Sequence, residues 1–195
     1  MRLITMQLMT TMFVIGSISL LSSCATLSKQ ECIVGDWQAI GYNDGVAGYS
    51  VERLASHSKA CAKVSVAPDY QAWERGRELG LQQYCTADSA YNVGRRGNAL
   101  NNVCPASMMS SLRKINQQGQ QYYTFINEIE KDKQLIKTYR DEYDKLRNGD
   151  MLDFETEKEA RTRLLYLPEE LYKIQRRIDN NERRIELLDR TNPYR

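Results

Sequence analysis

The sequence predicts an all-α protein, in which a small disulfide-linked helical domain with glycine-rich packing precedes a long antiparallel coiled-coil helical hairpin. Small and apolar residues recur at intervals of three or four between residues 36 and 101, and apolar residues recur at intervals of three, four or seven between 112 and 188. Both spacings follow the repeat of an α-helix rather than the alternation of a strand.

Charge density separates the two modules. Residues 24–110 contain 8 Lys+Arg and 8 Asp+Glu, whereas residues 111–195 contain 18 and 17. Glycine is also rare in the second segment. We therefore expect a Cys/Gly/aromatic helical domain at 32–106, a coiled-coil hairpin arm at 107–190 and a short tail at 191–195.

The composition argues against several classes of function. A net charge of +2 is far below the basic surplus of proteins that follow a phosphate backbone, so we expect no nucleic-acid partner. The single histidine, His57, leaves little capacity for acid–base or metal chemistry and is best interpreted as a polar residue on a helix surface. The sequence has no G-x-S-x-G, H-E-x-x-H or P-loop motif. We expect no enzymatic activity, no metal and no cofactor.

The first residues have the pattern of a secretory signal peptide, with Arg2 as the only charge before Lys29 and an apolar run in between. Leu21-Ser22-Ser23-Cys24 resembles the lipobox of bacterial lipoproteins. We therefore expect a signal peptide at 1–23, lipidation of Cys24 and a lipidated tether at 24–31 that holds the chain on the membrane. The alternative is an uncleaved transmembrane anchor. The resemblance implies an outer-membrane lipoprotein facing the periplasm, because Ala25 is not the aspartate that retains such proteins in the inner membrane.

A motif of an aspartate, an aromatic residue and two glycines recurs from Asp36, Asp69 and Asp88. Aspartate before a helix is a good N-cap, so we expect an interrupted helix at 36–63 and further helices at 69–84 and 88–101. Glycine inside a helix costs about 1 kcal/mol relative to alanine, and close contact between helices is the simplest reason to retain it. The alternative is a glycan- or peptide-binding groove lined by aromatic residues, with Trp37, Asp44, Trp73 and Tyr91 as the candidate ligand-binding residues.

Four cysteines remain after Cys24: Cys32, Cys61, Cys85 and Cys104. An even number in an exported chain is typical of two disulfides, for which three connectivities exist. If the three helices run up, down and up, Cys32 and Cys85 lie at one end and Cys61 and Cys104 at the other. The predicted pairs are therefore Cys32–Cys85 and Cys61–Cys104.

This pattern of cysteines, glycines and aromatic residues over about residues 32–105 resembles a family of bacterial envelope lipoproteins defined only as a domain of unknown function. The residues that carry the resemblance are Gly35-Asp36-Trp37, Gly41, Asp44-Gly45, Gly48, Arg53-Leu54, His57, Cys61, Pro68-Asp69, Gly76-Arg77, Gly80, Tyr84-Cys85, Gly94, Gly97 and Cys104-Pro105. The resemblance implies export and a role for the four thiols in the fold, but it implies no activity.

The second module has the pattern of a helical hairpin. Its first helix repeats every seven residues, at Ile115, Tyr122, Ile129, Ile136 and Tyr143, and Asn148-Gly149-Asp150 predicts the turn. The return helix has a seam at Leu164, Leu167, Leu171, Ile174, Ile178, Asn181, Ile185 and Leu188. We expect a kink and a fresh helical segment at Pro168, and Asn181 to fix the register of the seam.

These features favour a lipid-anchored cell-envelope protein with a structural or interaction role. The first helix of the arm carries more aromatic residues than a single seam covers, so residues 112–188 are expected to dock against the Cys/Gly domain, which is the default, or to contact another envelope protein or a second copy of the chain. Arg53, Arg75, Arg77, Arg95 and Arg96 form either a cationic rim or, as the preferred interpretation, surface ion pairs.

Overall fold

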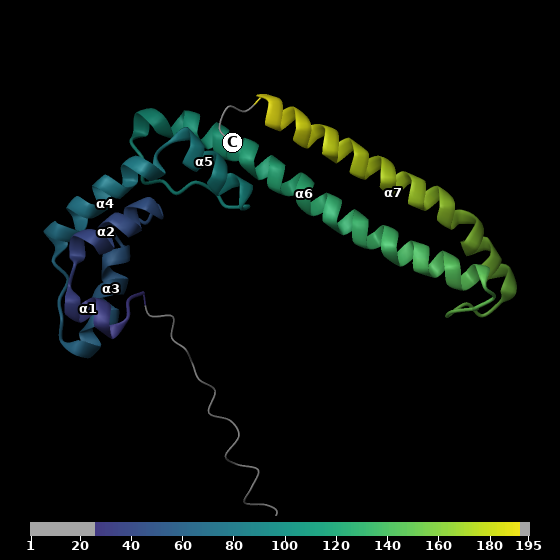
Figure 1. Cartoon of the computed structure of the whole chain (residues 1–195), viewed down its shortest axis with the longest axis horizontal. Coiled ribbons are helices and arrows are strands. Elements are labelled where there is room, and N and C mark those ends of the chain that lie inside the picture. Colours follow the sequence, from purple (N-terminus) through teal and green to yellow (C-terminus); the bar gives the residue numbers. More distant parts are fainter. Residues whose placement is uncertain (1–25, 192–195) are drawn as a thin grey trace, which may run out of the picture. The chain divides into compact units, whose positions relative to one another are not determined.

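The computed structural model describes residues 26–191, and this part of the chain is all-helical, as predicted (Figure 1). The helices are α1 (Lys29–Val34), α2 (Trp37–Val46), α3 (Arg53–Cys61), a short 3-10 helix η1 (Ala62–Val64), α4 (Tyr70–Tyr84), α5 (Ala87–Arg95), α6 (Ala106–Arg147) and α7 (Glu157–Thr191). No helix between residues 26 and 191 is both long and apolar enough to cross a bilayer. The predicted signal peptide at 1–23, the lipidation site Cys24 and the last residues of the predicted tail, 192–195, lie outside the described residues.

The described chain forms two compact units. The N-terminal unit consists of residues 26–35 and 54–68, and the main unit of residues 36–53 and 69–191. This division differs from the predicted modules at 32–106 and 107–190. The physical reason is that α6 packs against both α5 and α7, so a border at its first residue would separate α5 from its packing partner.

The N-terminal unit is organised around a disulfide between Cys32 on α1 and Cys61 at the end of α3, with both cysteines fully buried. The first helix starts at a capping box, in which Ser28 accepts a hydrogen bond from the Glu31 amide and Glu31 accepts one from the Ser28 amide. Hydrogen bonds to the Glu31 carboxylate from the Ser28 side chain and from the Ser28 amide lower the pKa of this carboxyl. The part of the predicted tether that the structure describes is therefore ordered, because α1 begins at Lys29 and Leu27 is buried.

The main unit begins with a crossing of α2 and α4 at four glycines. A Cβ atom on Gly41 would lie 1.9 Å from the carbonyl oxygen of Trp73, and one on Gly76 would lie 2.0 Å from that of Gln38. The same reciprocal contact is made by Gly45 and Gly80. Asp36 and Asp69 cap the two helices as predicted, each accepting a hydrogen bond from an amide three residues later. The prediction that the glycines serve close helix packing is confirmed.

A second glycine crossing joins α5 to the first part of α6. A Cβ atom on Gly94 would lie 2.1 Å from the carbonyl oxygen of Asn116, and one on Gly119 would lie 2.2 Å from that of Tyr91. The predicted cap Asp88 is wrong, since α5 begins earlier and its N-cap is Thr86. Ala90, Val93, Met109 and Leu112 form the core of this crossing together with the end of α4.

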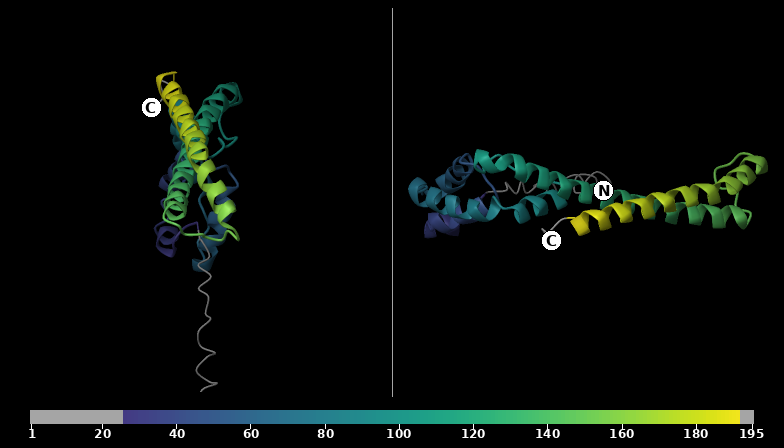
Figure 2. Two further views of the ribbon diagram at one scale, coloured as in Figure 1. Left: turned by 90° about the vertical axis from the view of Figure 1, so that its right-hand side faces the viewer. Right: turned by 90° about the horizontal axis from the view of Figure 1, so that it is seen from above.

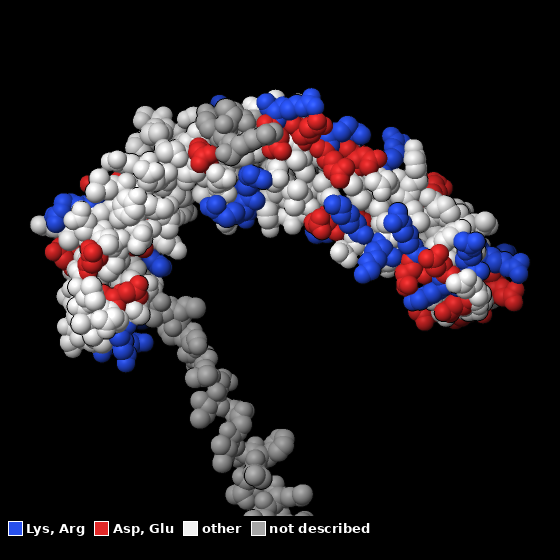
Figure 3. Space-filling view, viewed as in Figure 1, with Lys and Arg blue, Asp and Glu red and all other residues white. Residues whose placement is uncertain are grey.

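The second part of α6 and α7 form the predicted hairpin. Ile129 and Ile136 on α6 are buried together with Ile174 and Ile178 on α7, and nearer the turn Leu146 packs with Ala160 and Leu167. Residues further along α6 towards the turn pack against earlier residues of α7, so the helices are antiparallel, and the right-hand view of Figure 2 shows α7 running along α6. Charged residues of both signs alternate over this arm (Figure 3). The return helix continues through Pro168 as a single helix, so the predicted fresh segment is wrong.

The predicted disulfides Cys32–Cys85 and Cys61–Cys104 are wrong: the structure pairs Cys32 with Cys61 and Cys85 with Cys104. The error comes from overestimated helix length. The interrupted helix predicted at 36–63 is two separate helices, because α2 stops at Val46, Gly48 takes a left-handed conformation with a φ of 72°, and α3 begins only at Arg53. The helix predicted at 88–101 likewise ends at Arg95, before Gly97 with a φ of 81°. The first two of these four cysteines therefore pair with each other, and so do the last two.

We predict that Gly41→Ala destabilises the protein by about 3 kcal/mol or more, because the new methyl group would enter the backbone of α4. The sign of this stability change is informative, because Gly→Ala at an exposed position inside a helix stabilises a protein by about 1 kcal/mol. Urea unfolding measures the effect. Gly149→Ala is the control, because its site is open and only its φ of 89° is unfavourable. A Gly41→Ala protein as stable as wild type would contradict the packing role of this glycine.

We predict that non-reducing trypsin digestion links the peptide 30–53 to 60–63 and the peptide 78–95 to 97–113, because Lys or Arg residues separate all four cysteines. Removing either bridge by paired Cys→Ser changes should cost about 3–4 kcal/mol, given loops of 29 and 19 residues. Mass spectrometry identifies the linked peptides. A peptide linking Cys32 to Cys85 would exclude this connectivity.

Candidate functional site

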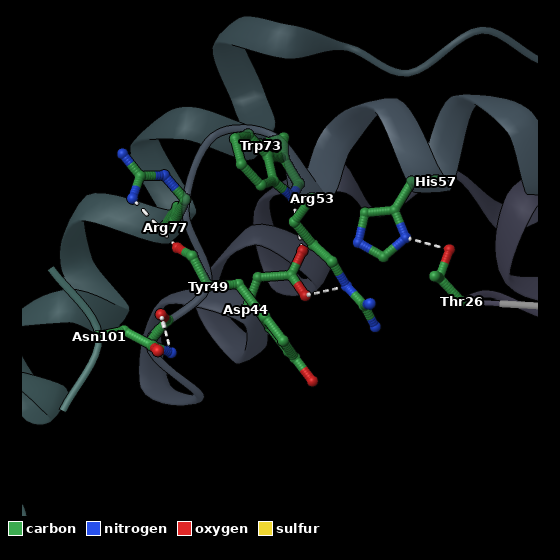
Figure 4. Close-up of polar contacts among 9 residues, drawn as sticks. Thr26, Asp44, Tyr49, Arg53, His57, Trp73, Arg77 and Asn101 are labelled. Carbon is green, nitrogen blue, oxygen red and sulfur yellow. Dashed lines mark hydrogen bonds and ion pairs between the residues drawn. The ribbon is translucent and has the colours of Figure 1, made fainter. Parts of the chain in front are cut away.

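Asp44, the one carboxylate among the candidate ligand-binding residues, is buried in the main unit. It is 6% exposed on α2, and its Oδ2 accepts a hydrogen bond of 2.8 Å from the indole Nε1 of Trp73 on α4. Its Oδ1 lies 3.6 Å from Nε of Arg53. Figure 4 shows the carboxylate between these two side chains. Asp44 therefore joins the α2–α4 crossing to the chain that leads away from α2.

Two arginines hold the segment between α2 and α3. The guanidinium of Arg53 lies 4.2 Å from the centre of the Tyr49 ring, and Nη1 of Arg77 donates a hydrogen bond of 3.3 Å to the Tyr49 carbonyl (Figure 4). Glu74 accepts two hydrogen bonds from Arg77, at 2.8 and 2.6 Å, and these raise the pKa of the guanidinium despite its partial burial. Arg77 thus stays cationic while it positions the loop.

Two backbone junctions are closed by asparagines that the sequence analysis did not single out. Asn116 on α6 is buried and donates to the carbonyls of Ala90 and Asn98, while its oxygen accepts from the Leu100 amide. Asn101 donates from its side chain to the Gly48 carbonyl, and its amide donates to the Tyr84 hydroxyl. A signal for Asn116 existed, since a lone amide within an apolar helix face indicates a buried hydrogen-bonding role.

The four predicted ligand-binding residues do not line a groove. Trp37, Trp73 and Tyr91 are 6%, 0% and 1% exposed, so their rings contact protein rather than offering a face to a ligand. Asp44 already accepts a hydrogen bond from Trp73 and faces Arg53. The burial of these four residues follows from the helix crossings, which the spacing of the sequence does not reveal.

Three of the five arginines of the predicted rim each make a separate local contact. Arg53 faces Asp44, Arg77 pairs with Glu74, and Arg95 stacks over the Tyr122 ring at 4.1 Å. Arg75 and Arg96 are exposed. The arrangement fits separate local contacts, the preferred interpretation, better than a shared cationic rim.

His57 is buried in the N-terminal unit, contrary to the predicted position on a helix surface. Its Nδ1 lies 2.8 Å from the hydroxyl oxygen of Thr26, which fixes the start of the described chain on α3 (Figure 4). Within residues 26–191, no three His, Cys, Asp or Glu side chains are grouped to hold a metal ion.

The most exposed large apolar side chains of the arm are on α7, although Tyr123 and Ile126 on α6 are also exposed. Tyr122, Phe125 and Tyr139 are each covered by an arginine, namely Arg95, Arg184 and Arg163. Leu165 and Tyr172, one heptad apart on α7, are instead 79% and 62% exposed, and Tyr166 lies beside them. The sequence contained this signal, because all three positions fall between residues of the buried seam.

Residues 36–121 match the model of a protein family described as protein of unknown function (DUF2799). The match includes both glycine crossings and ends two residues after Gly119. It agrees with the predicted resemblance to a domain of unknown function. No curated protein and no solved structure shows significant similarity to the chain.

We predict that Asp44→Ala lowers the free energy of unfolding by about 1–3 kcal/mol, because the buried Trp73 indole N–H loses its acceptor. Asp44→Asn should cost less, since an amide oxygen can still accept from Trp73. A double-mutant cycle with Trp73→Phe, followed by urea unfolding, isolates the pair. Purely additive effects of the two substitutions would show that this hydrogen bond contributes nothing to stability.

Proposed function

We propose that the chain is a lipid-anchored protein of the bacterial cell envelope, held through acylated Cys24, with a structural or interaction role. In this proposal it resides at the outer membrane and faces the periplasm. The membrane is contacted through the lipid, and residues 112–188 of the arm contact another envelope protein or a second copy. The proposal includes no catalytic step.

The pairing of the cysteines is the observation that most supports this proposal. The four cysteines after the lipobox all form disulfides, with Cys32 joined to Cys61 and Cys85 to Cys104. Disulfides persist in exported proteins and are rare in a reducing cytosol. Cys24 is therefore set apart both by its lipobox context and by the engagement of every other thiol with a partner.

The interior of the main unit supports a structural role over a ligand groove. At the two helix crossings, backbone of the facing helix occupies the space that a Cβ on each glycine would need, and Trp37, Trp73 and Tyr91 are buried. Asp44 is engaged by Trp73 and Arg53. These residues stabilise a rigid crossing of helices, and none offers the exposed ring that recognition of a sugar or peptide requires.

The arm supports an interaction role. Its seam residues are buried between α6 and α7, so a partner must use the outer surface. Leu165, Tyr166 and Tyr172 are the exposed apolar residues near the middle of α7, and charged side chains surround them. An apolar cluster with a charged rim is typical of a site for protein contact.

We predict that Cys24→Ser abolishes labelling by radioactive palmitate and moves the protein from the membrane to the soluble fraction of lysed cells, because a thiol is needed to carry the acyl chains. Ala25→Ser, which leaves the thiol in place, is the control and should retain both labelling and membrane association. Membrane retention of an unlabelled Cys24→Ser chain that resists washing with high salt and alkaline carbonate would instead support an uncleaved transmembrane anchor.

A further inference from the structure

One face of α1 is apolar and exposed. Ile33 and Val34 are 62% and 67% exposed, although they adjoin the fully buried Cys32. Consecutive helical residues are rotated by about 100°, so Lys29, Gln30, Ile33 and Val34 share the face opposite the Cys32–Cys61 disulfide. The disulfide thus fixes the inner side of α1 and turns two aliphatic side chains outwards.

The same unit carries a basic surplus. Its described residues contain Lys29, Lys59 and Lys63, all exposed, against the single acid Glu31. Lys29 belongs to the outward face of α1, and Lys63 lies on η1, which contacts α1. The Glu31 carboxylate lies at the start of α1, where it accepts a hydrogen bond from the Ser28 amide. This combination of exposed aliphatic residues and lysines is complementary to the surface of an anionic bilayer.

The distance to the acylation site places this unit at the membrane. Thr26 is hydrogen-bonded to His57 on α3, and Cys24 precedes Thr26 by two residues. Two residues of extended chain span about 7 Å at most. If Cys24 carries lipid, this short linker keeps the N-terminal unit next to the lipid headgroups.

We propose that the outward face of α1 rests in the headgroup region of the bilayer, with Ile33 and Val34 inserted at its apolar boundary and the lysines on anionic headgroups. The proposed location of this surface at a membrane in the cell rests on the proposed acylation of Cys24. Its affinity for lipid is a property of the folded unit and does not depend on the acyl group. Two aliphatic side chains are too small an area for a stable protein dimer, which buries more than about 1,200 Å². The same contact suffices for a unit that an acyl anchor already holds at high effective concentration.

The test uses residues 24–195 with Cys24→Ser, a chain that retains every described residue and has no acyl group. Sedimentation with vesicles of 30% phosphatidylglycerol and 70% phosphatidylethanolamine measures the partition coefficient. Ile33→Ser/Val34→Ser should lower this coefficient at least fivefold. The matched control Leu165→Ser/Tyr172→Ser removes a similar exposed apolar area from α7 and should change it less than twofold. Pure phosphatidylcholine or added salt should weaken binding of the parent chain.

Equal partitioning of the two double variants, or no binding of the parent chain, would overturn the proposal. A parent chain that is dimeric without vesicles and becomes monomeric on Ile33→Ser/Val34→Ser would overturn it in favour of a second copy. Because both residues are exposed, retained circular dichroism and an intact Cys32–Cys61 bond verify the fold. The experiment needs no acylation, so its outcome is independent of whether Cys24 carries lipid in cells.

Discussion

Backbone contact between helices at glycine positions is the constraint on which the main unit depends. At the α2–α4 crossing, Gly41 and Gly76 each face a carbonyl of the other helix at a separation that no Cβ could occupy. This fixes both the distance between the helices and their positions along each other. The hydrogen bond from Trp73 on α4 to Asp44 on α2 spans the same crossing. The buried aromatic residues fill the space beside the contact rather than forming a site of their own.

The second crossing repeats this arrangement and explains where the glycine-rich fold ends. Gly94 on α5 meets α6 at Asn116, and Gly119 meets α5 at Tyr91, a buried aromatic residue in the place that Trp73 takes at the first crossing. The motif beginning at Asp88 therefore pairs with a helix of the charged half instead of with the other two motifs. A family match that continues to residue 121 agrees with this packing, since α5 would lose its partner at any earlier border.

Structural features that depend on residues close in the sequence could be predicted from the sequence. Features that depend on where the chain reverses direction could not. Helix class, the caps Asp36 and Asp69, the packing role of the glycines and the Ile129–Ile178 seam all follow from local spacing. The disulfide pairing failed because it depends on where the chain turns, and a glycine at position 48 fits both a helix interior and a left-handed turn. Asp44 was predicted as a candidate ligand-binding residue, but its partner Trp73 is 29 residues away, and no local pattern distinguishes a buried hydrogen bond from an exposed ligand site.

Polar residues within the hairpin extend this positional control to the arm. Asn181 is buried in the seam and donates to Glu128, and Arg177 makes a paired contact with the largely buried Asp132. Such groups stabilise less than apolar residues would, but a shift of α7 along α6 would leave them without partners, so they select one register. Because α6 is one continuous helix from the glycine crossing to the turn, this register also fixes where the exposed Leu165 and Tyr172 lie on the arm. A protein that presents an apolar cluster to a partner needs that positional accuracy, whereas a hairpin serving only as a spacer would not.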